Sequence, residues 1–95
     1  MTPDQARRLA LSLPEAHEAP HFEKSSFRVG KKIFATLTED GRHLHVFIDE
    51  AETRAAVEED PASCEELWWG KRLSGVRVAL AAADPDRVVE LLEEA

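Results

Sequence analysis

Hydrophobic and polar residues alternate along residues 27–48, and this alternation predicts antiparallel strands at the centre of the chain. Period-two alternation is typical of strands that bury one face. The aliphatic positions expected to face the core are Ile33, Ala35, Leu37, Leu44, Val46 and Ile48. Asp40-Gly41 lies between the two runs and is typical of a two-residue type I′ turn, whose central residues both need positive φ. This turn predicts that Leu37 pairs with Leu44.

The opposite face of these strands has a different chemistry, because aromatic and basic residues occupy the alternate positions. Its expected members are Arg28, Lys32, Phe34, His43, His45 and Phe47. Phe34 and Phe47 are expected to meet there across the strand pair. The pattern therefore predicts one aliphatic face and one aromatic-basic face.

The connection between the first two strands of this region is predicted at Gly30. A three-residue loop would pair Val29 with Ile33 and place a bulge nearby, whereas a two-residue turn would pair Arg28 with Ile33 and mix the two faces. We favour the three-residue loop, because it keeps the aliphatic positions on one side.

Three helices are predicted from their starting residues. Thr2-Pro3-Asp4-Gln5 is a capping box with proline at the first helical position, and Pro14 ends the helix that follows. Asp49-Glu50-Ala51-Glu52 opens a short helix to about Glu59. Asp84-Pro85 starts the final helix.

The remaining segments are shorter. Glu15–Phe22 is predicted as a weak edge strand, since Pro20 is tolerated at a sheet edge and not in a central strand. Asp60-Pro61 predicts a turn of helix to about Leu67, and 76–80 alternates as the last strand. This order predicts an α+β fold in two layers, with an antiparallel sheet of about five strands and helices on one face. We expect a single domain over residues 1–95, with the aromatic-basic face uncovered.

Charge is distributed unevenly along the chain. The formal net charge of −7 argues against a simple nucleic-acid binder. Residues 24–45 nevertheless hold five basic side chains against two acidic ones, whereas residues 49–66 hold eight acidic side chains against Arg54. In a two-layer fold this distribution predicts a basic sheet and acidic helices.

The cysteine content and the hydropathy of the sequence indicate in which cellular compartment the protein is expected. The one cysteine, Cys64, excludes an internal disulfide and suits a reducing environment. No apolar run approaches the roughly 20 residues of a membrane span, and the N-terminus lacks the apolar region of a signal peptide. We therefore expect a cytoplasmic protein with no membrane partner.

The stretch His21–Leu37, HFEKSSFRVGKKIFATL, resembles the MmcQ/YjbR family of small bacterial proteins, whose pattern there is close to H-F-x-K-x-x-F-R-V-x-x-K-I-F-A. Leu13-Pro14 and Trp69-Gly70 extend the resemblance over nearly the whole chain. It implies a compact α+β fold likened to secretion-chaperone domains, and a DNA-binding label, with no catalytic residues to carry over. Glu23 and Ser25 depart from the small residues or proline often found at those positions.

The leading functional hypothesis is a non-enzymatic binding module that contacts DNA or single-stranded nucleic acid through the aromatic-basic face. Aromatic rings on a sheet stack on unpaired bases, and cations contact phosphates. The candidate residues are Arg28, Lys31, Lys32, Phe34, His45, Phe47, Lys71, Arg72 and Arg77, with Lys24 as a further phosphate contact. The alternative is a protein-interaction or homodimerisation module that uses the same face, with Trp68-Trp69 as a binding hot spot.

Catalysis and metal binding are not expected. Cys64 has no placed catalytic partner, and Ser25-Ser26 lies in no nucleophile motif. His43 and His45 share a strand face, with Cys64 and His21 as further candidate ligands, but two ligands do not make a metal site. The sequence therefore predicts no enzyme, no cofactor and no metal.

Overall fold

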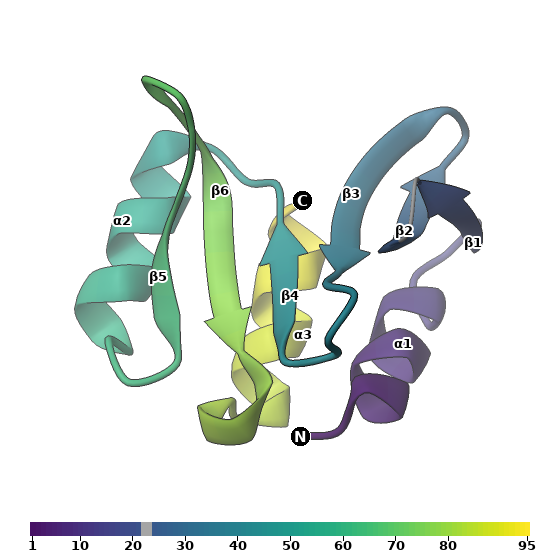
Figure 1. Ribbon diagram of the computed structural model, residues 1–95, viewed down its shortest axis with the longest axis horizontal. Coiled ribbons are helices and arrows are strands. Elements are labelled where there is room, and N and C mark those ends of the chain that lie inside the picture. Colours follow the sequence, from purple (N-terminus) through teal and green to yellow (C-terminus); the bar gives the residue numbers. More distant parts are fainter. Residues whose placement is uncertain (22–23) are drawn as a thin grey trace.

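The computed structural model describes residues 1–21 and 24–95 (Figure 1). In it, six antiparallel strands form one sheet, and three α-helices lie on one face of that sheet. The helices are α1 (Pro3–Leu11), α2 (Glu50–Glu59) and α3 (Pro85–Glu94). The strands are β1 (Ala16–His21), β2 (Lys24–Val29), β3 (Lys32–Leu37), β4 (His43–Val46), β5 (Cys64–Trp69) and β6 (Arg72–Ala79). The spatial order is β1-β2-β3-β4-β6-β5. The predicted α+β class is confirmed.

Each α-helix starts at its predicted cap. The Thr2 hydroxyl accepts a hydrogen bond from the Gln5 backbone N–H, and the Gln5 side chain accepts one from the Thr2 N–H. Asp49 and Asp84 cap α2 and α3 through their carboxylates. These bonds satisfy N–H groups that have no partner inside the helix. α1 ends at Leu11, before the predicted stop at Pro14.

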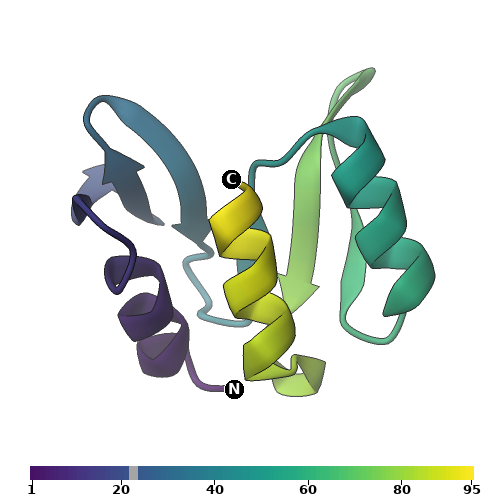
Figure 2. The same ribbon diagram turned by 180° about the vertical axis from the view of Figure 1, so that it is seen from behind.

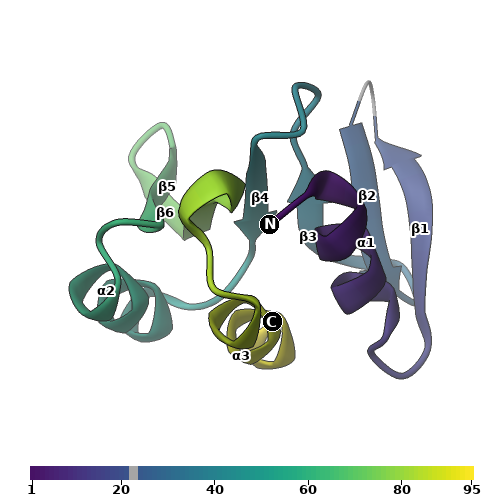
Figure 3. The same cartoon turned by 90° about the horizontal axis from the view of Figure 1, so that it is seen from below.

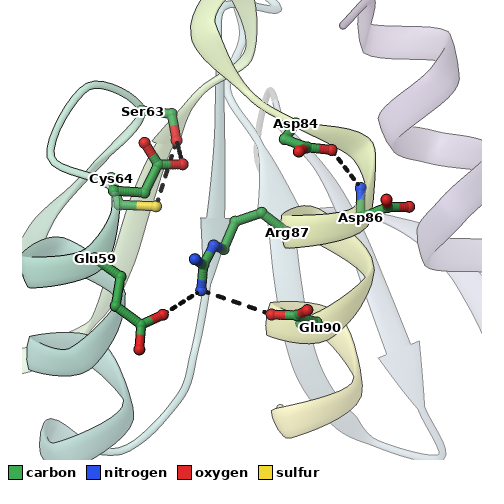
Figure 4. Close-up of polar contacts among 8 residues, drawn as sticks. Glu59, Ser63, Cys64, Asp84, Asp86, Arg87 and Glu90 are labelled. Carbon is green, nitrogen blue, oxygen red and sulfur yellow. Dashed lines mark hydrogen bonds and ion pairs between the residues drawn. The ribbon is translucent and has the colours of Figure 1, made fainter.

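The core lies between the sheet and the helix layer. Figure 2 and Figure 3 show all three helices on the same side of the strands. The largest fully buried apolar side chains are Phe27, Leu44, Leu80, Leu92, Val46, Val76, Val78 and Val88. Within the helix layer, Arg87 Nη1 of α3 donates to Glu59 Oε2 of α2 at 2.8 Å and lies 3.6 Å from Glu90 Oε2 (Figure 4). The opposite face of the sheet carries no helix among the described residues.

The predicted register of β3 and β4 is confirmed. Leu37 pairs with Leu44, and the neighbouring pairs are Thr36 with His45 and Ala35 with Val46. The turn type was wrong, because the loop spans residues 39–42.

A side-chain cap explains this longer loop. Gly41 alone within residues 39–42 has positive φ, at 70°. The Asp40 carboxylate accepts hydrogen bonds from the Arg42 N–H at 3.0 Å and the Thr38 hydroxyl at 2.7 Å. Those two bonds lower the pKa of Asp40. The register survives because Thr38 still bonds His43 across the loop.

A bulge between β2 and β3 changes which side chains face the core. The turn has two residues, with Gly30 at a φ of 62°, so Arg28 pairs with Ile33 rather than Val29 with Ile33. The register then shifts, and Phe27 pairs with Ala35. Phe34 is the extra residue.

The extra residue leaves the open face. Phe34 is 3% exposed and belongs to the hydrophobic core with Phe27 and Ala35. Both residues of a bulge oppose one partner, so Phe34 and Ala35 share the side of Phe27. The expectation that Phe34 meets Phe47 on the aromatic-basic face was wrong.

The segment after α2 also differs from its prediction. Residues 64–69 form β5 and pair with β6 instead of completing a helical turn, so the sheet has six described strands rather than about five. β1 is the edge strand predicted there. Phe22, which ended that prediction, and Glu23, in the family pattern, lie outside the described residues.

Phe34→Ala is expected to lower the free energy of unfolding by about 3–5 kcal/mol, because it leaves a cavity in a closed core. Phe47→Ala is the matched control and should cost less, because Phe47 is only half-buried. Urea denaturation of the two variants measures both losses. Equal losses would place Phe34 outside the core.

Candidate functional site

A cavity of about 560 Å³ opens where β4 ends. β4 stops at Val46, which pairs with Ala35 of β3 and Val76 of β6. β3 begins at residue 32 and β6 at residue 72, so both neighbours extend beyond that end. The cavity is lined by Lys24, Ile33, Thr36, His45, Phe47, Ile48, Asp49, Trp69, Arg72, Leu73 and Ser74. We call it the β4-end cavity.

Local backbone chemistry explains why β4 is short. The Phe47 N–H still donates to the Phe34 carbonyl at 3.0 Å. Two residues later, Asp49 caps α2 by accepting from the Glu52 N–H at 2.8 Å. The chain must therefore leave the sheet between Phe47 and Asp49. Gly75 allows the crossing, because a Cβ there would collide with the Val46 carbonyl.

An aromatic pair forms part of the cavity wall. The rings of Phe47 and Trp69 have centroids 5.3 Å apart and planes inclined by 55°. Phe47 is half-buried, whereas Trp69 is 59% exposed. Ile33 and Leu73 add apolar lining from the two strands that extend past β4. The cavity thus offers apolar walls with one accessible indole.

His45 is the buried polar group of this cavity. It is 9% exposed, and its Nε2 has no hydrogen-bond partner within residues 1–21 and 24–95. Burial lowers the pKa of His45 to about 4, with smaller contributions from the cations Lys24 and Arg77 and from His43. The ring is therefore neutral at pH 7. Thr36, its cross-strand partner, is 4% exposed and also lines the cavity.

The charged groups of the lining are mostly basic. Lys24 of β2 and Arg72 of β6 are exposed and form no ion pair with another described residue. Asp49 is the carboxylate of the lining, and its Oδ1 is engaged as the cap of α2. An anion is therefore attracted to the cavity mouth by two cations against one acid.

The structure gathers only part of the predicted site. His45, Phe47 and Arg72 line the cavity, together with Lys24. Lys31, Lys32 and Lys71 are exposed at the β2–β3 and β5–β6 turns. The two turns lie at the same end of the sheet, on either side of the end of β4 (Figure 1).

The two remaining arginines are engaged with protein groups. Arg28 Nε donates to the Ser26 hydroxyl at 3.1 Å. Arg77 Nε lies 3.4 Å from Glu65 Oε1, and its Nη2 lies 3.4 Å from His43 Nδ1. Neither arginine lines the cavity. The lining residues that the sequence did not predict as site residues are Ile33, Thr36, Ile48, Asp49, Leu73 and Ser74. The capping pattern just after β4 was the signal that could have located them.

The one cysteine, Cys64, does not line the β4-end cavity. Cys64 is 3% exposed, and its Sγ lies 3.6 Å from the Ser63 hydroxyl (Figure 4). Burial raises the pKa of the Cys64 thiol.

Residues 1–21 and 24–95 contain no cluster of three His, Cys, Asp or Glu side chains that could hold a metal. None of the helices in those ranges is long and apolar enough to cross a membrane.

Comparisons with known proteins point to one family. The family model described as YjbR matches residues 11–95. The crystal structure of the Deinococcus radiodurans protein DR2400, with family-model domain DUF419, superposes with a TM-score of 0.76. Its sequence is 24% identical, and the match covers 96% of this chain and 72% of that one, which supports the fold. A comparison with curated proteins finds no match.

The low pKa of His45 predicts a loss of stability in acid. The unfolded chain takes up this proton near the ordinary pKa of 6.5, whereas the folded chain takes it up at about 4. The free energy of unfolding is therefore unaffected by this proton above pH 6.5. It falls by up to about 3 kcal/mol as the pH is lowered from 6.5 to about 4, because only the unfolded chain takes up the proton readily in that range.

Urea denaturation at pH 7.5 and pH 4.5 checks this expectation against His45→Gln, which cannot titrate. The variant should lose less free energy of unfolding between the two pH values than the wild type. Carboxylates titrate in both proteins, so only the difference reports His45. Equal losses would show that its pKa is not lowered.

Proposed function

The chain belongs to the YjbR family, and from this premise we propose that it is a non-enzymatic module that binds single-stranded nucleic acid. The strand would lie across the β4-end cavity and the basic turns on either side. The observation that carries the proposal is the cavity itself, in which an exposed indole and two cations surround an apolar space.

The aromatic wall favours unpaired bases. Trp69 is 59% exposed, and its ring lies 5.3 Å from that of Phe47, so much of the indole is accessible to a base. Stacking of a base on an aromatic side chain contributes about 1–3 kcal/mol. Bases of a duplex are already stacked and paired, so this gain favours single strands.

The basic turns favour the phosphate backbone. Lys31-Lys32 and Lys71-Arg72 flank the end of β4 (Figure 1). The acidic residues of α2 and α3 lie in the helix layer on the other face (Figure 3). At physiological salt their repulsion is screened within about 8 Å, so a local basic surface acts on a bound strand despite the net charge of −7.

We propose a binding role without catalysis because of the groups that line the cavity. His45 is neutral, and the Asp49 carboxylate is engaged as a helix cap. The Cys64 thiol is buried outside the cavity, with a raised pKa. Thr36 pairs with His45 across the strands and both line the cavity, but His45 Nε2 makes no hydrogen bond to the Thr36 hydroxyl, so that nitrogen does not activate the hydroxyl as a nucleophile.

Self-association or binding of a protein partner through the same surface is the second candidate. Trp69 lines the cavity and is 59% exposed, and tryptophan is enriched at the centres of protein interfaces. Trp68, the other half of the predicted hot spot, does not line the cavity and donates its indole N–H to Glu66. An apolar interface would tolerate salt, whereas phosphate contacts lose affinity steeply as salt rises. Sedimentation at several protein concentrations measures self-association directly.

Fluorescence anisotropy with a labelled oligothymidine tests the leading proposal at 50 and 200 mM salt. Arg72→Glu should reduce affinity by about tenfold, because it replaces a phosphate contact by a repulsion. Arg8→Glu is the matched control, since Arg8 is exposed on α1 in the helix layer, and should leave affinity nearly unchanged.

Trp69→Ala tests the aromatic contribution separately. It should weaken binding of the single strand by about 1–3 kcal/mol and leave any duplex binding unchanged. If the wild type binds neither form at 50 mM salt, the nucleic-acid proposal fails. A dimer that forms at both salt concentrations would then support the second candidate.

A further inference from the structure

One buried polar atom in the β4-end cavity has no hydrogen-bond partner among the described residues. This atom is His45 Nε2, and its side chain is 9% exposed in a wall that also contains Ile33 and Leu73. Burial of a polar atom without a partner is unfavourable, so such an atom in a folded protein calls for an explanation. A ligand that supplies the missing partner is one explanation.

The surroundings of His45 form a short polar strip. Thr36 pairs with it across the strands and is 4% exposed, and both side chains line the cavity. A neutral imidazole offers one donor and one acceptor, and a hydroxyl offers both. The strip therefore matches a rigid edge on which donors and acceptors lie side by side. The edges of nucleobases have this arrangement.

The rest of the cavity fits the other parts of a nucleotide. Its volume of about 560 Å³ falls in the range of about 300–1,000 Å³ that is typical of small-molecule sites. Phe47 and Trp69 provide aromatic surface for a planar ring, and Lys24 and Arg72 provide exposed cations for a phosphate.

We propose that the β4-end cavity binds one unstacked nucleobase carrying a phosphate, with His45 and Thr36 hydrogen-bonded to the edge of the base. This inference rests on the proposed function and adds a specific site to it, since a stacking surface alone would not read a base edge. His45 Nε2 is closed to solvent in this structure, so the imidazole must rotate slightly to meet the ligand. The ring nitrogens should therefore report binding.

The experiment titrates the protein with nucleoside 5′-monophosphates and follows the imidazole nitrogens by NMR. Ribose 5-phosphate is the control ligand without a base. We expect the His45 resonances to shift with at least one monophosphate and to stay unchanged with ribose 5-phosphate. If ribose 5-phosphate shifts them equally, the base is not recognised and the inference is overturned.

Two variants test the hydrogen-bonding strip. His45→Phe keeps an aromatic ring and removes both nitrogens, and it should weaken monophosphate binding at least tenfold and reduce the preference among bases. Thr36→Val removes one hydroxyl and should have the same direction of effect. His17→Phe is the matched control, because His17 is exposed on the edge strand β1 and outside the cavity. Thermal unfolding confirms that each variant is folded.

Oligonucleotides separate this inference from the function on which it rests. If oligothymidine binds the wild type and His45→Phe equally, and no monophosphate binds, the base site is overturned and strand binding stands. If a monophosphate binds at least as tightly as an oligonucleotide, the base site is supported with a free nucleotide as its ligand. If neither binds, both proposals are overturned.

Discussion

The early end of β4 is the constraint on which the site depends. Val46 completes its pairs on both sides, and three residues later Asp49 must cap α2. The backbone therefore leaves the sheet while β3 and β6 continue past it. Gly75 makes the arrangement possible, because any side chain there would meet the Val46 carbonyl. A cavity lined by the strands on either side is the direct consequence.

Features that depend on neighbours in the sequence could be predicted. The helix starts follow from caps such as Thr2 and Asp49, whose bonds span three residues. The β3–β4 register was predicted from the position of Asp40-Gly41 and is confirmed, even though Asp40 closes a longer loop than expected. A bulge was expected near Gly30, but its position at Phe34 and the strand after α2 could not be predicted, since both depend on how whole strands pair.

The candidate site shows the same division. His45, Phe47 and Arg72 were predicted because their residue types suit a ligand, and they do share the cavity. Ile33 was missed because it was expected to face the core. The bulge places Phe34 in the core instead, and Ile33 lines the cavity. Thr36 has no distinctive chemistry in the sequence, and its place in the proposed site comes from its position beside a buried imidazole. Composition can therefore suggest the ligand class, but strand ends determine which side chains meet.

Basic and acidic side chains are divided unevenly between the layers of the fold, and the cavity opens on the basic side. The basic pair Lys71-Arg72 lies beside it, while α2 and α3 carry four acidic side chains each. Some of that acid is already neutralised, because Arg87 bonds Glu59 and Arg54 bonds Glu50. Screening over about 8 Å leaves each face with its own local field. Under the proposed function, an anion that approaches the open face would meet these cations first, and the apolar side chains behind them would contact its attached ring.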